Sequence, residues 1–300
     1  MNVTKKEIAS LVSDFSIEVT PASAERVEAF ADHLVLGTSI NVTFLPGSSF
    51  TDTIRVSRRI HEEGFKPIPH LAARNFESSK ALEQSLDNLT SHANVEEVLI
   101  IAGGLDSPLG PYHSTMQILE TGLLEKYSIK KIGIAGHPEG SPDISNLDID
   151  SALNDKNAWA RNTDIEVYIA TQFCFEASVI LDWEARIKKL GNTLPIHIGL
   201  PGLATLKTLL KFAKMSGIGP SMRVLTRQTK NLAKLVMTQE PDIVITDLTS
   251  RIAGAPDSLI KKVHFYPFGG LAKTAAWANS VVNEQIEMKP TKGFNTYINY

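Results

Sequence analysis

The chain has 300 residues, of which 43% are hydrophobic and 21% are charged, and its formal net charge is -3. These values are those of an ordinary globular protein, and the small negative charge argues against a nucleic-acid binder, which would present a basic face. No apolar stretch approaches the roughly 18 residues needed to cross a bilayer. The N-terminal residues lack the long apolar core of a signal peptide, so we expect a soluble, cytoplasmic protein without membrane contacts.

Cys174 is the only cysteine, which excludes an intramolecular disulfide. It lies in the apolar run Gln172–Phe175. A buried, inert thiol is therefore predicted, because a reactive cysteine needs an exposed and electropositive setting.

Eight short runs rich in β-branched and aliphatic residues are predicted to be strands. Most are almost continuously apolar, as expected for strands that are covered on both faces. In chain order they are Phe15–Thr20, Ser39–Leu45, Lys66–Ala72, Glu97–Ala102, Lys131–Gly136, Glu166–Phe173, Pro195–Leu200 and Val263–Phe268. Segments with helical periodicity follow four of them: Ala22–Leu34, Thr51–Glu63, Ser78–His92 and Glu176–Leu190.

The alternation of strands and helices indicates a parallel sheet, because parallel neighbours need a crossover that is usually helical. Eight such units in a chain of this length are typical of a TIM barrel. An open doubly wound sheet is the main alternative, but no Gly-x-Gly-x-x-Gly follows an early strand. Met222–Ile252 adds helix and a short apolar run, Ile243–Ile245. We therefore predict a single (β/α)8-barrel domain over residues 1–300, with an extra helical insertion before the last strand.

The functional side of such a barrel is the C-terminal edge of its strands. Polar residues and glycines are frequent at the predicted strand ends. These ends read Glu18, Thr43, His70, Gly103-Gly104-Leu105-Asp106, His137, Gln172, Pro201 and Tyr266. Because all these ends meet at one edge, the sequence predicts one pocket there.

Two carboxylates at this edge could carry chemistry. Glu18 lies inside the first strand, where loss of water favours a protonated carboxyl that can donate its proton. The alternative is a structural salt bridge with a lysine or arginine. Asp106 follows a Gly-Gly pair that lets a ligand approach the backbone, and its carboxylate can face developing positive charge. The alternative for Asp106 is a turn-forming role before Ser107-Pro108.

Three further side chains at the edge suit recognition. Gln172 carries donors and acceptors that fit the edge of a heterocycle, or it is a buried amide satisfied by neighbouring backbone. His70 and His137 have no other ligand type at close spacing, so we predict no metal site. Hydrogen bonding to a cofactor or to the backbone is expected of both histidines. No nucleophile elbow, P-loop or zinc motif occurs.

In this order the segments resemble the methylenetetrahydrofolate reductases over roughly residues 12–285. Phe15–Glu18 resembles the strand that carries the family's proton-donating glutamate. Pro69-His70-Leu71 resembles a flavin-contacting segment, and Thr171-Gln172-Phe173 resembles a folate-contacting one. The other matching segments are Val42-Thr43-Phe44, near the nicotinamide donor, Ile101–Asp106, beside flavin and folate, Ala135–Pro142, in a flavin-binding loop, and His264-Phe265-Tyr266, in the closing strand.

The resemblance implies a set of cofactor-binding residues: Thr43, His70, Gly104, His137, Ser141, Asp150 and Lys156. The chain departs from the family at several places. Its fifth loop carries His137 and Ser141 where members usually carry a tyrosine and a later histidine. Gly103-Gly104-Leu105-Asp106 stands where members usually carry Arg-Gly-Asp, and Phe268-Gly269-Gly270 stands where a folate-contacting arginine is expected. These departures concern flavin and folate-tail contacts more than they concern Glu18 or Gln172.

The function implied by the resemblance is an oxidoreductase that interconverts 5,10-methylenetetrahydrofolate and 5-methyltetrahydrofolate with NADH or NADPH, through bound FAD. Glu18 would protonate N10, Asp106 would stabilise the cationic intermediate and Gln172 would orient the pterin. Two alternatives stay open: a flavin-independent reductase with direct hydride transfer, and a pterin-binding barrel partner of a methyl-transfer or demethylation pathway. The exposed helices of a barrel could also pair two copies of the chain.

Overall fold

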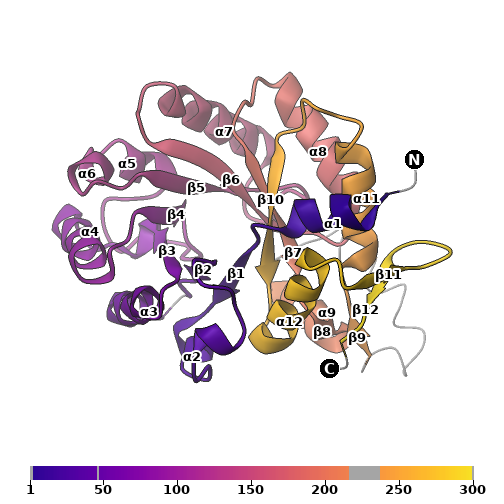
Figure 1. Ribbon diagram of the computed structural model, residues 1–300. Coiled ribbons are helices and arrows are strands. Elements are labelled where there is room, and N and C mark those ends of the chain that lie inside the picture. The colour runs from indigo at the N-terminus through magenta and orange to yellow at the C-terminus, as the bar shows by residue number, and fades with distance from the viewer. Residues whose placement is uncertain (1–2, 46, 216–236, 299–300) are drawn as a thin grey trace. The chain divides into compact units, whose positions relative to one another are not determined.

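A computed structural model describes residues 3–45, 47–215 and 237–298. Eight parallel strands form a closed barrel in the order β1-β10-β7-β6-β5-β4-β3-β2, and Figure 1 traces them along the chain. Their bounds are β1 Ser16–Val19, β2 Ser39–Val42, β3 Lys66–Ala72, β4 Glu97–Ile101, β5 Lys131–Gly136, β6 Glu166–Phe173, β7 Ile196–Pro201 and β10 Ile260–Tyr266. The predicted TIM-barrel fold class is confirmed.

The predicted strands differ from the observed ones only near their ends. β3, β5 and β6 have the predicted bounds. β10 ends at Tyr266, before the predicted Phe268. The next residue, Pro267, has no N–H to donate to a ladder, which explains this end.

Three of the four helices predicted to follow strands form, at 51–63, 78–92 and 176–190, and the structure adds helices that were not predicted. In full, the described helices are α1 Lys5–Val12, α2 Pro21–Ala24, α3 Phe50–Glu62, α4 Ser79–Ala93, α5 Thr115–Leu119, α6 Leu123–Lys126, α7 Asn146–Ala160, α8 Ala177–Lys189, α9 Leu206–Met215, α11 Asp242–Ile252 and α12 Leu271–Val282, with short 3-10 turns η1 Phe30–Asp32 and η2 Ala73–Asn75. Two small antiparallel pairs complete the description: β8 Ala204–Thr205 with β9 Thr238–Gln239, and β11 Ile286–Met288 with β12 Phe294–Thr296. Among the described residues, no helix is long and apolar enough to span a bilayer.

The predicted helix over 22–34 is wrong as a continuous element, because only α2 and η1 form there. The Arg59 guanidinium donates to the carbonyl oxygens of Ala24, Val27 and Glu28 at 2.6–2.9 Å. The Phe30 N–H donates to the carboxylate of Glu63 at 2.7 Å. Backbone groups that would have bonded within one helix are thus bonded to side chains at the end of α3 and just beyond it.

The predicted insertion before the last strand is described only in part. Residues 222–236 lie outside the described residues. In the described remainder, residues 242–252 form α11, and the apolar run Ile243–Ile245 lies within this helix.

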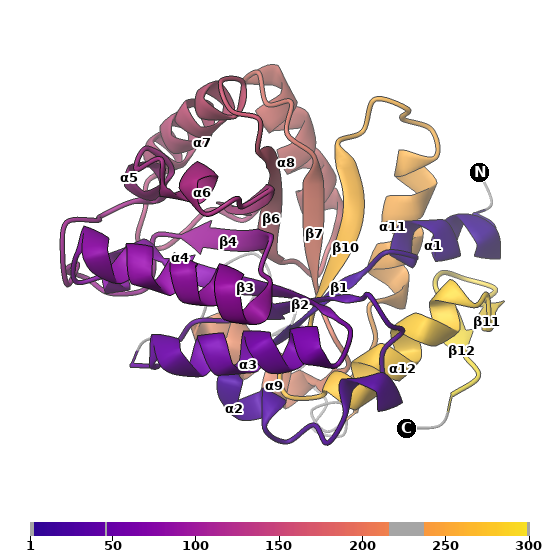
Figure 2. The same ribbon diagram turned by 60° about the vertical axis from the view of Figure 1, so that its left-hand side comes forward.

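The chain divides into two compact units. The first comprises residues 1–17, 136–151 and 171–300, and the second comprises 18–135 and 152–170. In the second unit α3 and α4 lie side by side, and α3 packs on β3 (Figure 2). In the first unit α1 packs on α11 and α12, with Trp277 fully buried against Phe265 and Phe294. β1 and β6 each have residues in both units. The single domain stays a prediction.

Candidate functional site

Glu18 lies beside His70 and Asn41 in the second unit. The three side chains come from β1, β3 and β2, which are consecutive in the barrel. Glu18 Oε2 lies 4.0 Å from His70 Nε2, and the two side chains are 15% and 6% exposed. His70 Nε2 lies 3.3 Å from Asn41 Oδ1, and Asn41 is buried. The structure therefore brings together two residues that the sequence singled out, Glu18 and His70, and adds Asn41.

The environment of His70 Nε2 indicates where the ring carries its proton. Nε2 faces two oxygen atoms that accept hydrogen bonds, one from the amide of Asn41 and one from the carboxyl group of Glu18. The tautomer with hydrogen on Nε2 satisfies this arrangement, because an unprotonated nitrogen would oppose the acceptor Oδ1. The imidazole N–H is therefore directed at Asn41 Oδ1, and the Glu18 carboxyl group lies 4.0 Å from the same nitrogen.

Thr43 follows β2 and carries a buried hydroxyl. Its Oγ1 has no hydrogen-bond partner among the described residues. Its N–H donates to Val19 O at 2.8 Å, which holds the backbone just past β2 against the end of β1. Side chains two residues apart share a face of a strand, so Thr43 continues the face of Asn41. A buried polar atom without a partner is unusual and indicates a place for an outside group.

Gln172 lies near the end of β6, in the first unit, on a backbone that is held on both sides. Thr171 Oγ1 accepts from the Gly199 N–H and donates to Gln172 O, each at 2.8 Å. The Tyr266 hydroxyl donates to Thr171 O at 2.9 Å. The Gln172 side chain is half-buried. These bonds from β7 and β10 position the backbone from which the predicted folate-contacting amide extends.

Asp106 and Gly104 are exposed in the loop that follows β4. This loop is held by Arg74, whose Nη1 donates to Leu105 O at 2.9 Å and whose Nε donates to His113 O at 3.0 Å. Sequence reasoning missed Arg74, although its place directly after a predicted strand was a signal. The structure thus places Asp106 on a loop that is anchored to the end of β3.

The remaining cofactor residues have different surroundings. His137 and Ser141, in the first unit, are half-buried, and Ser141 Oγ accepts from the Asp143 N–H at 3.2 Å. Asp150 accepts hydrogen bonds from Arg186 Nη1 at both carboxylate oxygens, at 2.8 and 2.6 Å. In the second unit, burial lowers the pKa of Lys156 on α7. Among the described residues, no group of three or more His, Cys, Asp or Glu side chains is placed to hold a metal ion.

Cys174 is buried, as the sequence predicted, and burial raises the pKa of its thiol far above the ordinary value. The thiolate is the reactive form of cysteine. Cys174 is therefore an inert part of the core.

A cavity of about 540 Å³ lies in the first unit beside the ends of β6 and β7, and it was not predicted. Glu240 lines it and accepts a hydrogen bond from Trp277 Nε1 at 3.0 Å. Burial, with a smaller contribution from Asp242, raises the pKa of Glu240, while the bond from Trp277 and the charge of Lys289 act in the opposite direction. The charged form of Glu240 is therefore disfavoured in the folded protein.

This raised pKa predicts the behaviour of Glu240→Gln. A carboxyl group whose pKa is higher in the folded protein than in the unfolded chain stabilises the fold at pH values below its ordinary pKa of about 4.3. This stabilisation is lost as the pH rises through the folded-state pKa. Glutamine stays neutral and can still accept from Trp277. We expect the variant to have a higher urea midpoint than the parent at neutral pH, and a smaller gain near pH 4. The exposed Glu287→Gln is the control, and an equal gain at both pH values would contradict the prediction.

Comparison with known proteins gives a family and a fold. Residues 8–273 match the family model for methylenetetrahydrofolate reductase. A solved structure described as an uncharacterized protein from Clostridium thermocellum that binds two copies of 5-methyl-5,6,7,8-tetrahydrofolic acid is similar, with a TM-score of 0.54 and 12% identity over 91% of this chain and 98% of that chain. Dihydropteroate synthase from Thermus thermophilus gives a TM-score of 0.47 and 10% identity over 88% and 91%. At 12% identity the Clostridium thermocellum structure shows similarity of fold alone.

Proposed function

Because the chain belongs to the methylenetetrahydrofolate reductase family, we propose that it interconverts 5,10-methylenetetrahydrofolate and 5-methyltetrahydrofolate with NADH or NADPH as the electron source. The observation that carries the proposal is the placement of Glu18 beside His70 and Asn41 on three consecutive barrel strands. The methyltetrahydrofolate named for the Clostridium thermocellum protein of similar fold is consistent with a folate ligand.

The reaction begins with protonation of the substrate, and hydride transfer follows. In the substrate one methylene carbon bridges N5 and N10. Glu18 donates its proton to N10, the bond between the methylene carbon and N10 breaks with its electron pair going to N10, and an iminium cation forms at N5. Hydride then adds to the methylene carbon and gives the N5 methyl group. One proton and one hydride are consumed for each product molecule.

His70 and Asn41 act as positioning residues for this acid. Asn41 Oδ1 lies 3.3 Å from His70 Nε2 and orients its N–H. The same nitrogen lies 4.0 Å from Glu18 Oε2. When Glu18 loses its proton it becomes a carboxylate in a largely buried site. The neighbouring N–H dipole is already oriented to stabilise that charge, so little rearrangement is needed during the reaction.

We propose a folate-binding role for Gln172 and for Asp106, as the resemblance of their segments to the family implies. The Gln172 amide presents both donor and acceptor groups to the pterin edge. The Asp106 carboxylate, carried by the loop that Arg74 holds, stabilises the iminium cation.

The residues present do not make a complete FAD site. A bound flavin, when reduced, would supply the hydride, yet two of the predicted contacts suit it poorly. The Asp150 carboxylate is already paired with Arg186, and Gly104 lies in a loop that lacks the family's arginine. Bound FAD stays a prediction, and this observation favours direct hydride transfer from the nicotinamide as a second candidate.

Turnover by the purified full chain tests the proposal. We expect oxidation of NADH or NADPH that depends on methylenetetrahydrofolate, with 5-methyltetrahydrofolate as the product identified by chromatography. Direct transfer predicts no visible flavin absorbance and no increase in rate with added FAD. A flavin spectrum that bleaches with methyltetrahydrofolate would overturn direct transfer and leave the reductase intact. Folate binding without turnover under all these conditions would instead support a pterin-binding barrel without reductase activity.

A further inference from the structure

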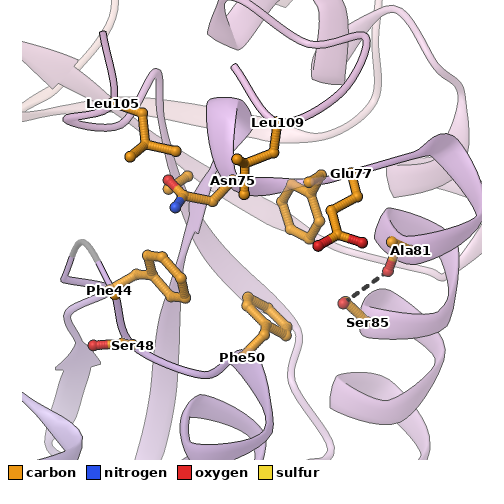
Figure 3. Close-up of a pocket in the computed structure, with 12 residues that line it drawn as sticks. Phe44, Ser48, Phe50, Asn75, Glu77, Ala81, Ser85, Leu105 and Leu109 are labelled. Carbon is orange, nitrogen blue, oxygen red and sulfur yellow. Dashed lines mark hydrogen bonds between the residues drawn. The ribbon is translucent and has the colours of Figure 1, made fainter. Parts of the chain in front are cut away.

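The second unit contains another cavity, whose lining does not include Glu18 or His70. We call it the aromatic pocket, and Figure 3 shows it in close-up. Its volume is about 440 Å³, within the range of roughly 300–1,000 Å³ that is usual for ligand pockets. It is lined by Phe44, Gly47, Ser48, Phe50, Ala72, Asn75, Phe76, Glu77, Ala81, Ser85, Leu105 and Leu109. Ala72 ends β3, and the other residues follow the ends of β2, β3 and β4 or lie on α3 and α4.

Three phenyl rings line one part of the aromatic pocket. The ring centroids of Phe44 and Phe50 are 6.1 Å apart, and those of Phe50 and Phe76 are 5.5 Å apart, with tilted planes. Phe44 and Phe76 are buried, whereas Phe50 is half-buried. Aromatic side chains in such a setting attract a planar ring, which gains both burial and edge or face contacts.

The loop after β4 closes another side of the aromatic pocket and is held in place independently of any ligand. Arg74 bonds its carbonyl groups, and the Leu109 N–H donates to Arg74 O at 2.9 Å. A side chain at Gly110 would place its Cβ 2.4 Å from backbone atoms of Glu77, so only glycine allows this approach. The loop thus presents Leu109, which is 57% exposed, to the pocket. A ligand that covers Leu109 gains apolar burial without having to order the loop.

The polar groups of the aromatic pocket favour a ligand that donates hydrogen bonds. Glu77 supplies a carboxylate, which accepts only, and Asn75 and Ser48 can either donate or accept. Figure 3 labels Glu77 and Asn75 among the residues that line the pocket. The negative charge of Glu77 repels a phosphate or carboxylate at this place, while an amino group on a ring would be attracted.

We propose that the aromatic pocket binds a planar aromatic ring that carries an amino group. An adenine nucleotide and a primary arylamine such as p-aminobenzoylglutamate share this chemistry. In either case the ring lies among Phe44, Phe50 and Phe76, its amino group donates to Glu77, and Leu109 covers it. The proposal concerns binding alone and does not depend on the proposed reductase activity.

Filling the aromatic pocket tests the proposal. Ala81 is half-buried on α4 and lines the pocket, and leucine is also a good helix former. Calorimetric titration of the full chain with adenosine monophosphate, and separately with p-aminobenzoylglutamate, should give saturable binding of at least one. Ala81→Leu should weaken that binding by about tenfold or more, because its side chain occupies the space of the ring. Gln84→Leu, which adds the same side chain at an exposed position of α4 outside the pocket, should leave the binding unchanged.

A second variant tests the amino group. Glu77 is exposed, so Glu77→Gln should fold normally. This variant should bind adenine several-fold more weakly than the parent does. It should bind purine, which lacks the amino group, with unchanged affinity. Binding of the nucleotide alone, or of the arylamine alone, would support the proposal and identify the source of the ring. Binding of neither, or binding that Ala81→Leu leaves unchanged, would overturn it. Because the titrations need no hydride donor and should persist in Glu18→Gln, their failure is distinguishable from failure of the reductase proposal.

Discussion

Replacing Glu18 with glutamine is expected to lower kcat for methylenetetrahydrofolate reduction by about 10²–10⁴-fold, the usual contribution of a general acid. Glutamine has nearly the same shape and retains an oxygen toward His70, which lies 4.0 Å from the carboxylate. It has no acidic proton to give to N10. Folate binding should therefore survive while the opening of the bridged substrate fails. Turnover under saturating folate and separate equilibrium titration with methyltetrahydrofolate measure the two effects.

A matched control is available on another strand of the same unit. Glu166 is exposed and begins β6, at the end of the barrel opposite to the predicted site. Glu166→Gln should leave both turnover and binding unchanged. If Glu18→Gln keeps the parental turnover, Glu18 has no part in the mechanism. If it loses folate binding as well, its role is to hold the substrate.

Gly199→Ala is expected to reduce the free energy of unfolding by about 3 kcal/mol, at the upper end for overpacked positions. An added Cβ would lie 2.4 Å from Thr171 O, 2.7 Å from the Tyr266 ring and 2.8 Å from Gln172 O. Two of these neighbours are backbone atoms of a central strand, which cannot move aside as a flexible side chain can. The clash should also weaken the Gly199 N–H bond to Thr171 Oγ1 and shift the backbone that carries Gln172.

Urea unfolding of the full chain measures this loss, and Gly254→Ala is the control. A Cβ at Gly254 would meet only Arg251 O at 3.8 Å, an ordinary contact. We expect little change there. Equal free energies of unfolding for the two variants would contradict the prediction, because β6 and β7 would then accommodate the added Cβ without destabilising the fold. Reduced folate affinity of Gly199→Ala, measured at a urea concentration where it is still folded, would support the position of Gln172 at the substrate.

The amino-acid sequence alone was sufficient for the eight strands of the barrel and for three of the helices between them. Lys66–Ala72 and Glu166–Phe173 contain the apolar runs Pro67–Pro69 and Val167–Ala170, as expected for parallel strands that are buried on both faces. The predicted helices over α3, α4 and α8 follow in the same way from their periodicity. Glu18 and His70 could be placed at one edge because parallel strands in a barrel have a common direction.

Only the tertiary structure decided which of these groups have partners and where further ligands fit. The backbone over 24–30 leaves the predicted helix because Arg59 and Glu63, far along the chain, bond it. Asp150 is paired with Arg186, and the aromatic pocket is assembled from loops after three different strands. Periodicity is a property of neighbouring residues, whereas an ion pair or a cavity depends on distances between residues that are remote in sequence. The strands were therefore predictable, and the partners of the side chains at their ends were not.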